Sequence, residues 1–250
     1  MDKGSILTTT FVSTMKKLHN LQKKAFAIVG VFAALLVLPE ARAAEYPYHT
    51  GGWYGTGAFS KIINANGSGF RVDLGSSVLT DGEIDYDGNF GAAVAIGYEN
   101  SFCFRKNKPL YLRLEAELFG GSAHRNTVDV GVRHADLDDT VQLRALFFNG
   151  LLGINDTRHT RWWLGGGLGY GQVKIPDASA ATGSCTCLQA ATTEGLAWRL
   201  KLVGERTMSK NTALFGEAGY MKLPGGQKGA AHCYDDMYLT NVAIGLRTYF

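Results

Sequence analysis

Residues 109–119, PLYLRLEAELF, alternate between apolar and charged or bulky side chains. The even-numbered positions 110–118 are all Leu or Ala, whereas the odd-numbered positions include Arg113, Glu115 and Glu117. A strand turns successive side chains to opposite faces and would separate these two sets, while a helix would scatter the charges around its surface. The stretch therefore predicts a β-strand with one apolar face and one charged face.

The same alternation recurs along the chain. Clear runs of period two occupy residues 89–98, 162–170, 195–205 and 241–250, and weaker runs occupy residues 53–60, 140–148 and 212–221. Together with residues 109–119, these segments predict eight strands. The composition agrees, because the chain contains 32 glycines and each glycine inside a helix would cost about 1 kcal/mol relative to alanine.

The connections between these segments alternate in length. Long connections rich in Gly, Asp and Asn cover residues 61–87, 120–138, 172–193 and 222–236, and shorter ones cover residues 99–109, 154–160 and 204–211. Long loops at one end and short turns at the other are typical of an outer-membrane barrel with an even number of strands. We therefore predict an all-β fold, an eight-stranded antiparallel up-and-down transmembrane β-barrel over residues 53–250.

The N-terminal residues have the three parts of a secretory signal. Lysines 16, 17, 23 and 24 precede an uncharged apolar run, Ala25–Leu38, and a small-residue cleavage site follows. We assign residues 1–43 to a signal peptide, with Met15 as a possible true start, cleavage between Ala43 and Ala44, and residues 44–52 as a short tail. The alternative is an uncleaved anchor, which is disfavoured because a spanning helix needs roughly 18 to 20 apolar residues.

Removal of this signal changes the charge of the chain. The formal net charge of +3 comes from 25 basic and 22 acidic residues, and residues 1–43 hold six of the basic and two of the acidic ones. The mature chain therefore has a net charge of −1. Because a nearly neutral chain has no electrostatic basis for binding nucleic acid, no nucleic-acid partner is expected.

The charged strand faces are assigned to the barrel interior, which in an eight-stranded barrel is only wide enough for side chains. The predicted lumen network consists of Arg113, Glu115, Glu117, Arg144, Arg199, Lys201, Glu217 and Arg247. Enclosed ions must pair or be hydrated. We expect these side chains to plug the lumen, and the alternative is a narrow pore.

Aromatic residues of the apolar faces gather near the strand ends. Trp53, Tyr98, Trp162 and Phe250 lie near the short turns, and Phe59, Phe90, Tyr170, Trp198, Tyr220 and Tyr238 lie toward the long loops. Two aromatic rings around an aliphatic band are typical of membrane-interface girdles. This sorting favours apolar faces turned to lipid over the alternative, a soluble lipocalin-like barrel with its apolar face inside.

Three short motifs carry a resemblance to a known family. WYGTGAF at residues 53–59, RWWLGGGLGYG at 161–171 and IGLRTYF at 244–250, behind a signal peptide, resemble the opacity-type, OmpA-like eight-stranded outer-membrane barrels. The resemblance implies a place in the bacterial outer membrane. It also implies that the terminal Phe250 is the signal recognised by the barrel-assembly machinery.

No catalytic, cofactor-binding or metal site is predicted. The histidines lie in predicted loops, turns or the tail rather than beside a serine on a strand face, so a Ser-His enzyme is not expected. Cys185 and Cys187 lie in the third long loop and Cys233 in the fourth, and a disulfide between Cys233 and either of them is expected. Cys103 lies at the opposite end, beyond the roughly 7 Å Cα separation that a disulfide can bridge.

These observations together predict a monomeric surface protein of the outer membrane. Its expected role is structural or interactive, in adhesion or envelope integrity, and is exerted through the long loops. The expected partners are outer-membrane lipid, the barrel-assembly machinery, and host or envelope ligands at the loops. A narrow solute pore and a soluble lipocalin-like carrier are the alternatives.

Overall fold

The computed structural model describes residues 51–66, 69–73, 79–105, 108–130, 133–156, 160–177, 190–228 and 232–250. The predicted signal peptide with its cleavage site at Ala43 and Ala44, and most of the predicted tail, lie outside these residues. The described part of the chain has no helix that is long and apolar enough to cross a bilayer.

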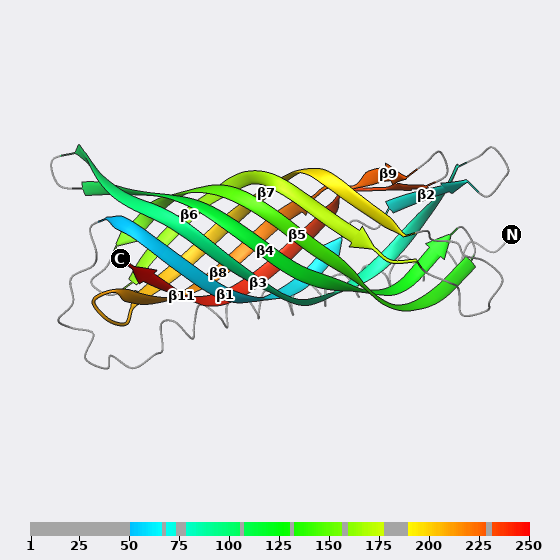
Figure 1. The fold of residues 1–250 in the computed structure, drawn as a ribbon, viewed down its shortest axis with the longest axis horizontal. Helices are drawn as coiled ribbons and strands as arrows, with labels where there is room; N and C mark the ends of the chain where they lie inside the picture. Colours follow the sequence, from blue (N-terminus) through cyan, green and yellow to red (C-terminus); the bar gives the residue numbers. More distant parts are fainter. Residues whose placement is uncertain are drawn as a thin grey trace, which may run out of the picture.

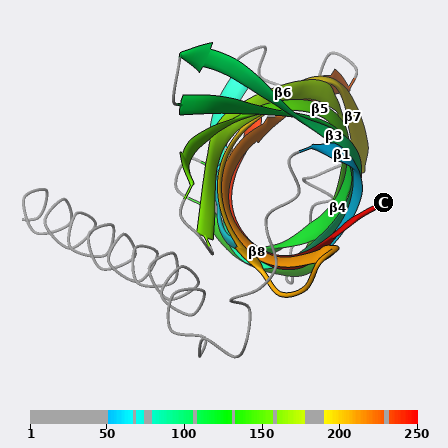
Figure 2. The same ribbon diagram turned by 90° about the vertical axis from the view of Figure 1, so that its left-hand side faces the viewer.

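The described residues form one sheet of eleven strands, and eight of these close into a barrel (Figures 1 and 2). The ring consists of β1 (Gly52–Asn66), β3 (Leu79–Arg105), β4 (Lys108–Val130), β5 (Arg133–Asp156), β6 (Thr160–Ile175), β7 (Ala191–Thr207), β8 (Thr212–Leu223) and β11 (Met237–Tyr249). Each strand pairs antiparallel with its neighbours, and β1 closes the ring by pairing with both β3 and β11. The predicted eight-stranded antiparallel barrel is confirmed.

Three short strands extend the sheet at the end of the long connections, on the right in Figure 1. They are β2 (Gly69–Asp73), β9 (Gly226–Lys228) and β10 (His232–Tyr234), in the order β3-β2-β10-β9. Cys233 lies in the middle of β10, between Arg71 of β2 and Gln227 of β9, and forms no disulfide with a described residue. The predicted partners Cys185 and Cys187 lie outside the described residues, so the disulfide of Cys233 stays a prediction.

The strands are longer than the sequence indicated. β3, β4 and β5 have 27, 23 and 24 residues, whereas a membrane-spanning strand needs about 9 to 11. β3 and β4 stay paired from Gly82 and Val130 at one end to Arg105 and Lys108 at the other. The prediction of loops over residues 61–87 and 120–138 was therefore largely wrong, because the barrel wall continues beyond the membrane-spanning part.

The polarity of the wall reverses along β5. Near the long-loop end Val141 and Leu143 are buried inside while Gln142 is exposed outside. Further toward the short turns the exposed outer positions become Leu146 and Phe148. A barrel in water hides its apolar face and a barrel in lipid exposes it, so this reversal marks a surface of the membrane.

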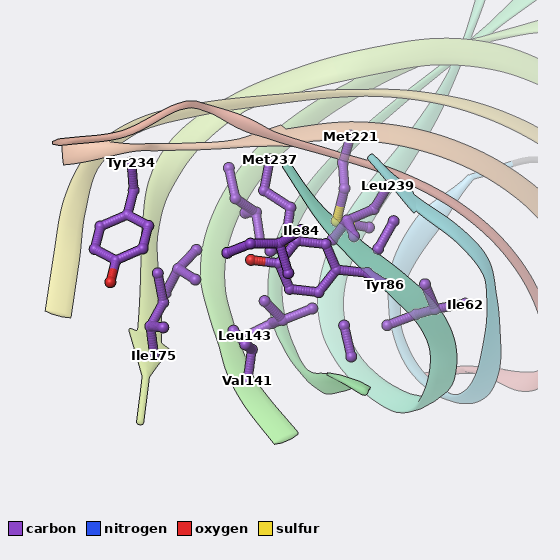
Figure 3. Close-up of a cluster of buried hydrophobic side chains, with 14 of the residues drawn as sticks. Ile62, Ile84, Tyr86, Val141, Leu143, Ile175, Met221, Tyr234, Met237 and Leu239 are labelled. Atoms are coloured by element: carbon purple, nitrogen blue, oxygen red, sulfur yellow. The ribbon is translucent and has the colours of Figure 1, made fainter. Parts of the chain in front are cut away.

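The interior of the long-loop end is packed with apolar side chains (Figure 3). This cluster, which we call the long-loop core, includes Ile62, Ile84, Tyr86, Val141, Leu143, Ile175, Met221, Tyr234, Met237 and Leu239. These ten residues come from β1, β3, β5, β6, β8, β10 and β11 and are less than 9% exposed. The extended part of the wall is thus held together like a water-soluble barrel, with its apolar side chains inside.

Candidate functional site

Most of the predicted lumen charges converge inside the barrel. They are Arg113, Glu115 and Glu117 on β4, Arg199 and Lys201 on β7, Glu217 on β8 and Arg247 on β11, and all are buried. Successive side chains of a strand point to opposite faces, so residues two apart on one strand, such as Arg113, Glu115 and Glu117, all point into the lumen.

Arg144 does not belong to this network, and its prediction as a lumen residue was wrong. Its side chain is exposed on the outer wall, while Leu143, Ala145 and Phe147 occupy the inward positions of the same part of β5. Because β5 is apolar on both faces here, its alternation could not show which face was inside.

Three ionised residues of the network were missed. Glu99, Arg161 and Glu205 are at most 2% exposed and form ion pairs in the lumen. They lie at the ends of the predicted strands, in or beside the predicted short connections 99–109, 154–160 and 204–211. Their inward orientation continues the period of two past the expected strand ends, and that continuation is the sequence signal that could have found them.

A first group of ion pairs lies near the short turns. The guanidinium of Arg113 lies 2.8 Å from the carboxylate of Glu99 and 2.7 Å from that of Glu205. Arg161 also binds Glu99, at 2.7 Å, and the hydroxyl of Tyr249 donates to Glu99 at 2.9 Å. Residues of β3, β4, β6, β7 and β11 are thereby joined across the lumen.

A second group lies toward the middle of the barrel. The ammonium of Lys201 lies 3.1 Å from the carboxylate of Glu115, 2.7 Å from that of Glu117 and 3.0 Å from that of Glu217. Arg199 bridges Glu117 and Glu217. Each ion in this group therefore has at least two partners of opposite sign or an additional hydrogen bond, as burial of an ion requires.

Arg247 connects the two groups, because it contacts Glu205 of the first and Glu115 of the second. Within the described residues the connected network holds five basic side chains (Arg113, Arg161, Arg199, Lys201 and Arg247) and five acidic ones (Glu99, Glu115, Glu117, Glu205 and Glu217). Its formal charge is therefore zero. A neutral, multiply bonded set of ions can be enclosed where an unpaired ion could not.

Aromatic rings fix the arginines from the sides. The guanidinium carbon of Arg113 lies 3.6 Å from the ring centroid of Trp163. That of Arg247 lies 4.7 Å from the centroid of Tyr54 and 5.1 Å from that of Phe215. These cation–π contacts fill the remaining width of the lumen.

One small cavity lies among the described residues of the network. A cavity of about 20 Å³ lies beside Ser60, Lys201, Asn241 and Arg247, which is room for about one water molecule. At the level of the charge network, the packing therefore resembles a filled core rather than a channel.

The predicted girdle aromatics lie at outward positions, exposed or half-buried. The residues are Trp53, Phe59, Phe90, Tyr98, Trp162, Tyr170, Trp198, Tyr220, Tyr238 and Phe250. Several of their rings touch: the centroids of Trp53 and Tyr98 are 5.4 Å apart, those of Trp198 and Tyr220 are 5.7 Å apart, and those of Tyr220 and Tyr238 are 6.2 Å apart. Contacts between girdle residues occur both near the short turns and toward the long-loop end.

His124 falls within residues 120–138, which the sequence predicts to be a long connection, but it lies instead on a strand. His124 belongs to β4, and its Nε2 atom lies 3.6 Å from the carboxylate of exposed Asp138. Within the described residues, no group of three or more His, Cys, Asp or Glu side chains is placed to hold a metal ion.

Comparison with known proteins gives structural matches only. No protein-family model matches the sequence, and no curated protein sequence matches it. The outer membrane protein OprG from Pseudomonas aeruginosa is similar in structure, with a TM-score of 0.51 and 13% identity over 82% of this chain and 99% of that chain. The Neisserial surface protein A also matches, with a TM-score of 0.47 and 13% identity over 81% of this chain and 100% of that chain. At these identities the likeness to OprG shows the fold alone.

The fold and the site together define a class of protein. A closed barrel that exposes an apolar band between aromatic girdles and encloses its charges is a transmembrane β-barrel of the outer-membrane type. We place the chain in the bacterial outer membrane on these grounds. The lipocalin-like alternative is contradicted, because large apolar side chains such as Val94, Leu114 and Leu168 are more than half exposed on the outer wall.

Proposed function

We propose that this protein is a surface protein of the outer membrane in which the barrel is a closed anchor. Its role is structural or interactive, in adhesion or envelope integrity, and belongs to the long-loop end. The observation that carries the proposal is that two different sets of side chains fill the lumen at two levels along its length. The neutral ion network fills the part within the membrane, and the long-loop core fills the part beyond it.

The shape of the long-loop end supports a role in contact with other molecules. β3, β4 and β5 continue past the apolar band. The small sheet of β2, β10 and β9 adds to the edge of β3, on the right in Figure 1. A packed apolar interior makes this extension a firm platform, and its outer face is polar. We propose that host or envelope ligands bind there, with the protein acting as a monomer.

The assembly role of Phe250 is also a proposal. Its side chain is 77% exposed immediately after β11, and its backbone N–H donates to the carbonyl of Trp53 at 3.1 Å. This position at the seam of the barrel supports recognition of the terminal aromatic residue by the barrel-assembly machinery.

The first test concerns conduction. Purified mature protein, inserted into a planar lipid bilayer, is expected to give no conductance steps above the baseline of the bare bilayer, because ions would have to displace both the ion network and the long-loop core. The lower mobility of boiled relative to unboiled protein on a gel would establish that the inserted material is folded. Steady conductance steps from folded protein would favour the narrow solute pore instead.

The second test concerns the surface role, in cells that lack the protein. Supplying the wild-type chain is expected to restore adherence to host cells or resistance to detergent, whichever the deletion lowers. A variant with residues 226–234 replaced by a short Gly-Ser linker is expected to restore it poorly. Among the described strands, β9 pairs only with β10, and β10 pairs only with β9 and β2. The variant therefore keeps the strand pairs of the eight-stranded ring that anchors the protein. Full restoration by this variant, or no effect of the deletion in either assay, would contradict the proposal.

A further inference from the structure

Arg144 lies at the level where the outer wall changes from polar to apolar. It is in register with Gly120 of β4 and Gln172 of β6. One outward row closer to the short turns, the corresponding residues are Leu146 and the girdle residue Tyr170, which are paired with each other. Interfacial tyrosines mark the headgroup level of a bilayer, so the guanidinium of Arg144 projects from the wall at that level.

A groove runs along the outer wall beside Arg144. Its volume is about 580 Å³, and apolar side chains that include Val94, Leu118 and Leu146 line it. Gly120 lines the groove without adding a side chain to it, and a Cβ atom added there would meet no atom within 4 Å. Arg144 and Gln172 line the same groove on its polar side, so it combines an apolar wall with a cationic rim.

Two cations at this rim form no ion pair with any described residue. They are Arg144 and Lys174, which stand on adjacent strands in diagonal positions, because Arg144 is opposite Gln172 and Lys174 is two residues further along β6. Diagonal neighbours in a sheet are roughly 7 to 8 Å apart at their Cα atoms, so both side chains can reach one ligand. The acidic residue of the same row, Glu194, accepts hydrogen bonds from Gln172 at 2.6 Å and from Tyr170 at 2.8 Å.

We propose that this groove binds a phosphorylated lipid of the surrounding outer leaflet. The phosphate is held by Arg144 and Lys174, and an acyl chain lies in the groove against Val94, Leu118 and Leu146. The charge of the rim requires an anionic headgroup, the apolar wall requires a hydrocarbon chain, and a guanidinium binds phosphate oxygens through two parallel hydrogen bonds. The site is on the outer wall and does not depend on the function proposed for the long-loop end.

The test measures lipid retained by the folded mature protein in detergent by native mass spectrometry. The probes are dioleoyl phosphatidic acid and dioleoylglycerol, which carry the same chains with and without the phosphate. The wild-type protein is expected to bind the phosphatidic acid about tenfold more tightly, the size expected for charge-assisted contacts. Equal binding of the two lipids would overturn the proposal, since the groove would then recognise chains only.

Variants separate the rim from the groove. Arg144→Gln and Lys174→Gln are each expected to remove most of the preference for phosphatidic acid. Lys210→Gln removes the same charge from an exposed position near the short turns and should change nothing. Gly120→Leu is expected to weaken both lipids by filling the groove, whereas Gly150→Leu, at another open position, should not. Unchanged preference in both rim variants, or equal effects of the two leucine variants, would contradict the assignment; unboiled gel mobility confirms folding of each variant.

Discussion

Replacement of Glu115 by alanine is expected to lower the free energy of unfolding by about 3–5 kcal/mol. The carboxylate of Glu115 lies 3.1 Å from the ammonium of Lys201 and 3.3 Å from the guanidinium of Arg247, and it accepts a hydrogen bond from the hydroxyl of Tyr54 at 3.0 Å. Its loss would leave a surplus positive charge enclosed in the lumen. The measurement is urea unfolding in detergent micelles, followed by the mobility of unboiled samples.

Two controls separate this effect from the loss of any glutamate. Glu194→Ala removes an exposed carboxylate from the outer wall and should leave the unfolding midpoint nearly unchanged. The double variant Glu115→Gln/Lys201→Gln restores charge neutrality and should be more stable than the sum of the two single effects predicts. An unchanged unfolding midpoint for Glu115→Ala, or strict additivity in the double variant, would show that the network does not stabilise the barrel.

Much of the fold could be predicted from local pattern, because strand alternation is a local property. In residues 109–119 every even position is apolar and the charges are odd, so one segment is enough to assign both its structure and its two faces. The same rule placed Arg199 and Lys201, whose strand also carries Leu196, Leu200 and Leu202. Since Lys201 and Leu202 are adjacent, the pattern fixes opposite faces for them without knowledge of any other strand.

The rule failed where both faces of a strand are apolar. In β5, residues 143–148 read LRALFF. The side chains on the inner face pack in the long-loop core, while Leu146 and Phe148 on the outer face are exposed toward lipid. Only the register with β4 and β6 shows that Arg144 points outward. Glu99 and Glu205 were missed for a different reason. The predicted strands stopped at the length that a membrane-spanning strand needs, whereas β3 continues to Arg105 and β7 continues to Thr207.

The long-loop core was hidden by composition. Residues 120–138 contain three Asp, three Gly and one Asn, residue types that are typical of loops. Their few apolar side chains, such as Val128 and Leu137, nevertheless turn inward and are at most 8% exposed. A wall that leaves the membrane needs apolar residues on its inner face and polar ones outside, so its strands look polar in total while they still alternate.

Replacement of Leu143 by alanine provides the test of this reversal of polarity. Leu143 is 1% exposed in the long-loop core, and its truncation is expected to cost about 2–5 kcal/mol, because the packed neighbours cannot fill the cavity. Leu146→Ala, three residues further along the same strand, removes the same atoms from a side chain that is 38% exposed toward lipid. Mobile acyl chains fill that space, so only the transfer contribution remains and the cost should stay below about 2 kcal/mol. Urea unfolding in lipid vesicles, followed by tryptophan fluorescence, would compare the two variants. Equal losses would mean that Leu143 does not lie in a rigid packed interior, and the long-loop end would then lose the firmness on which its proposed role as a contact platform rests.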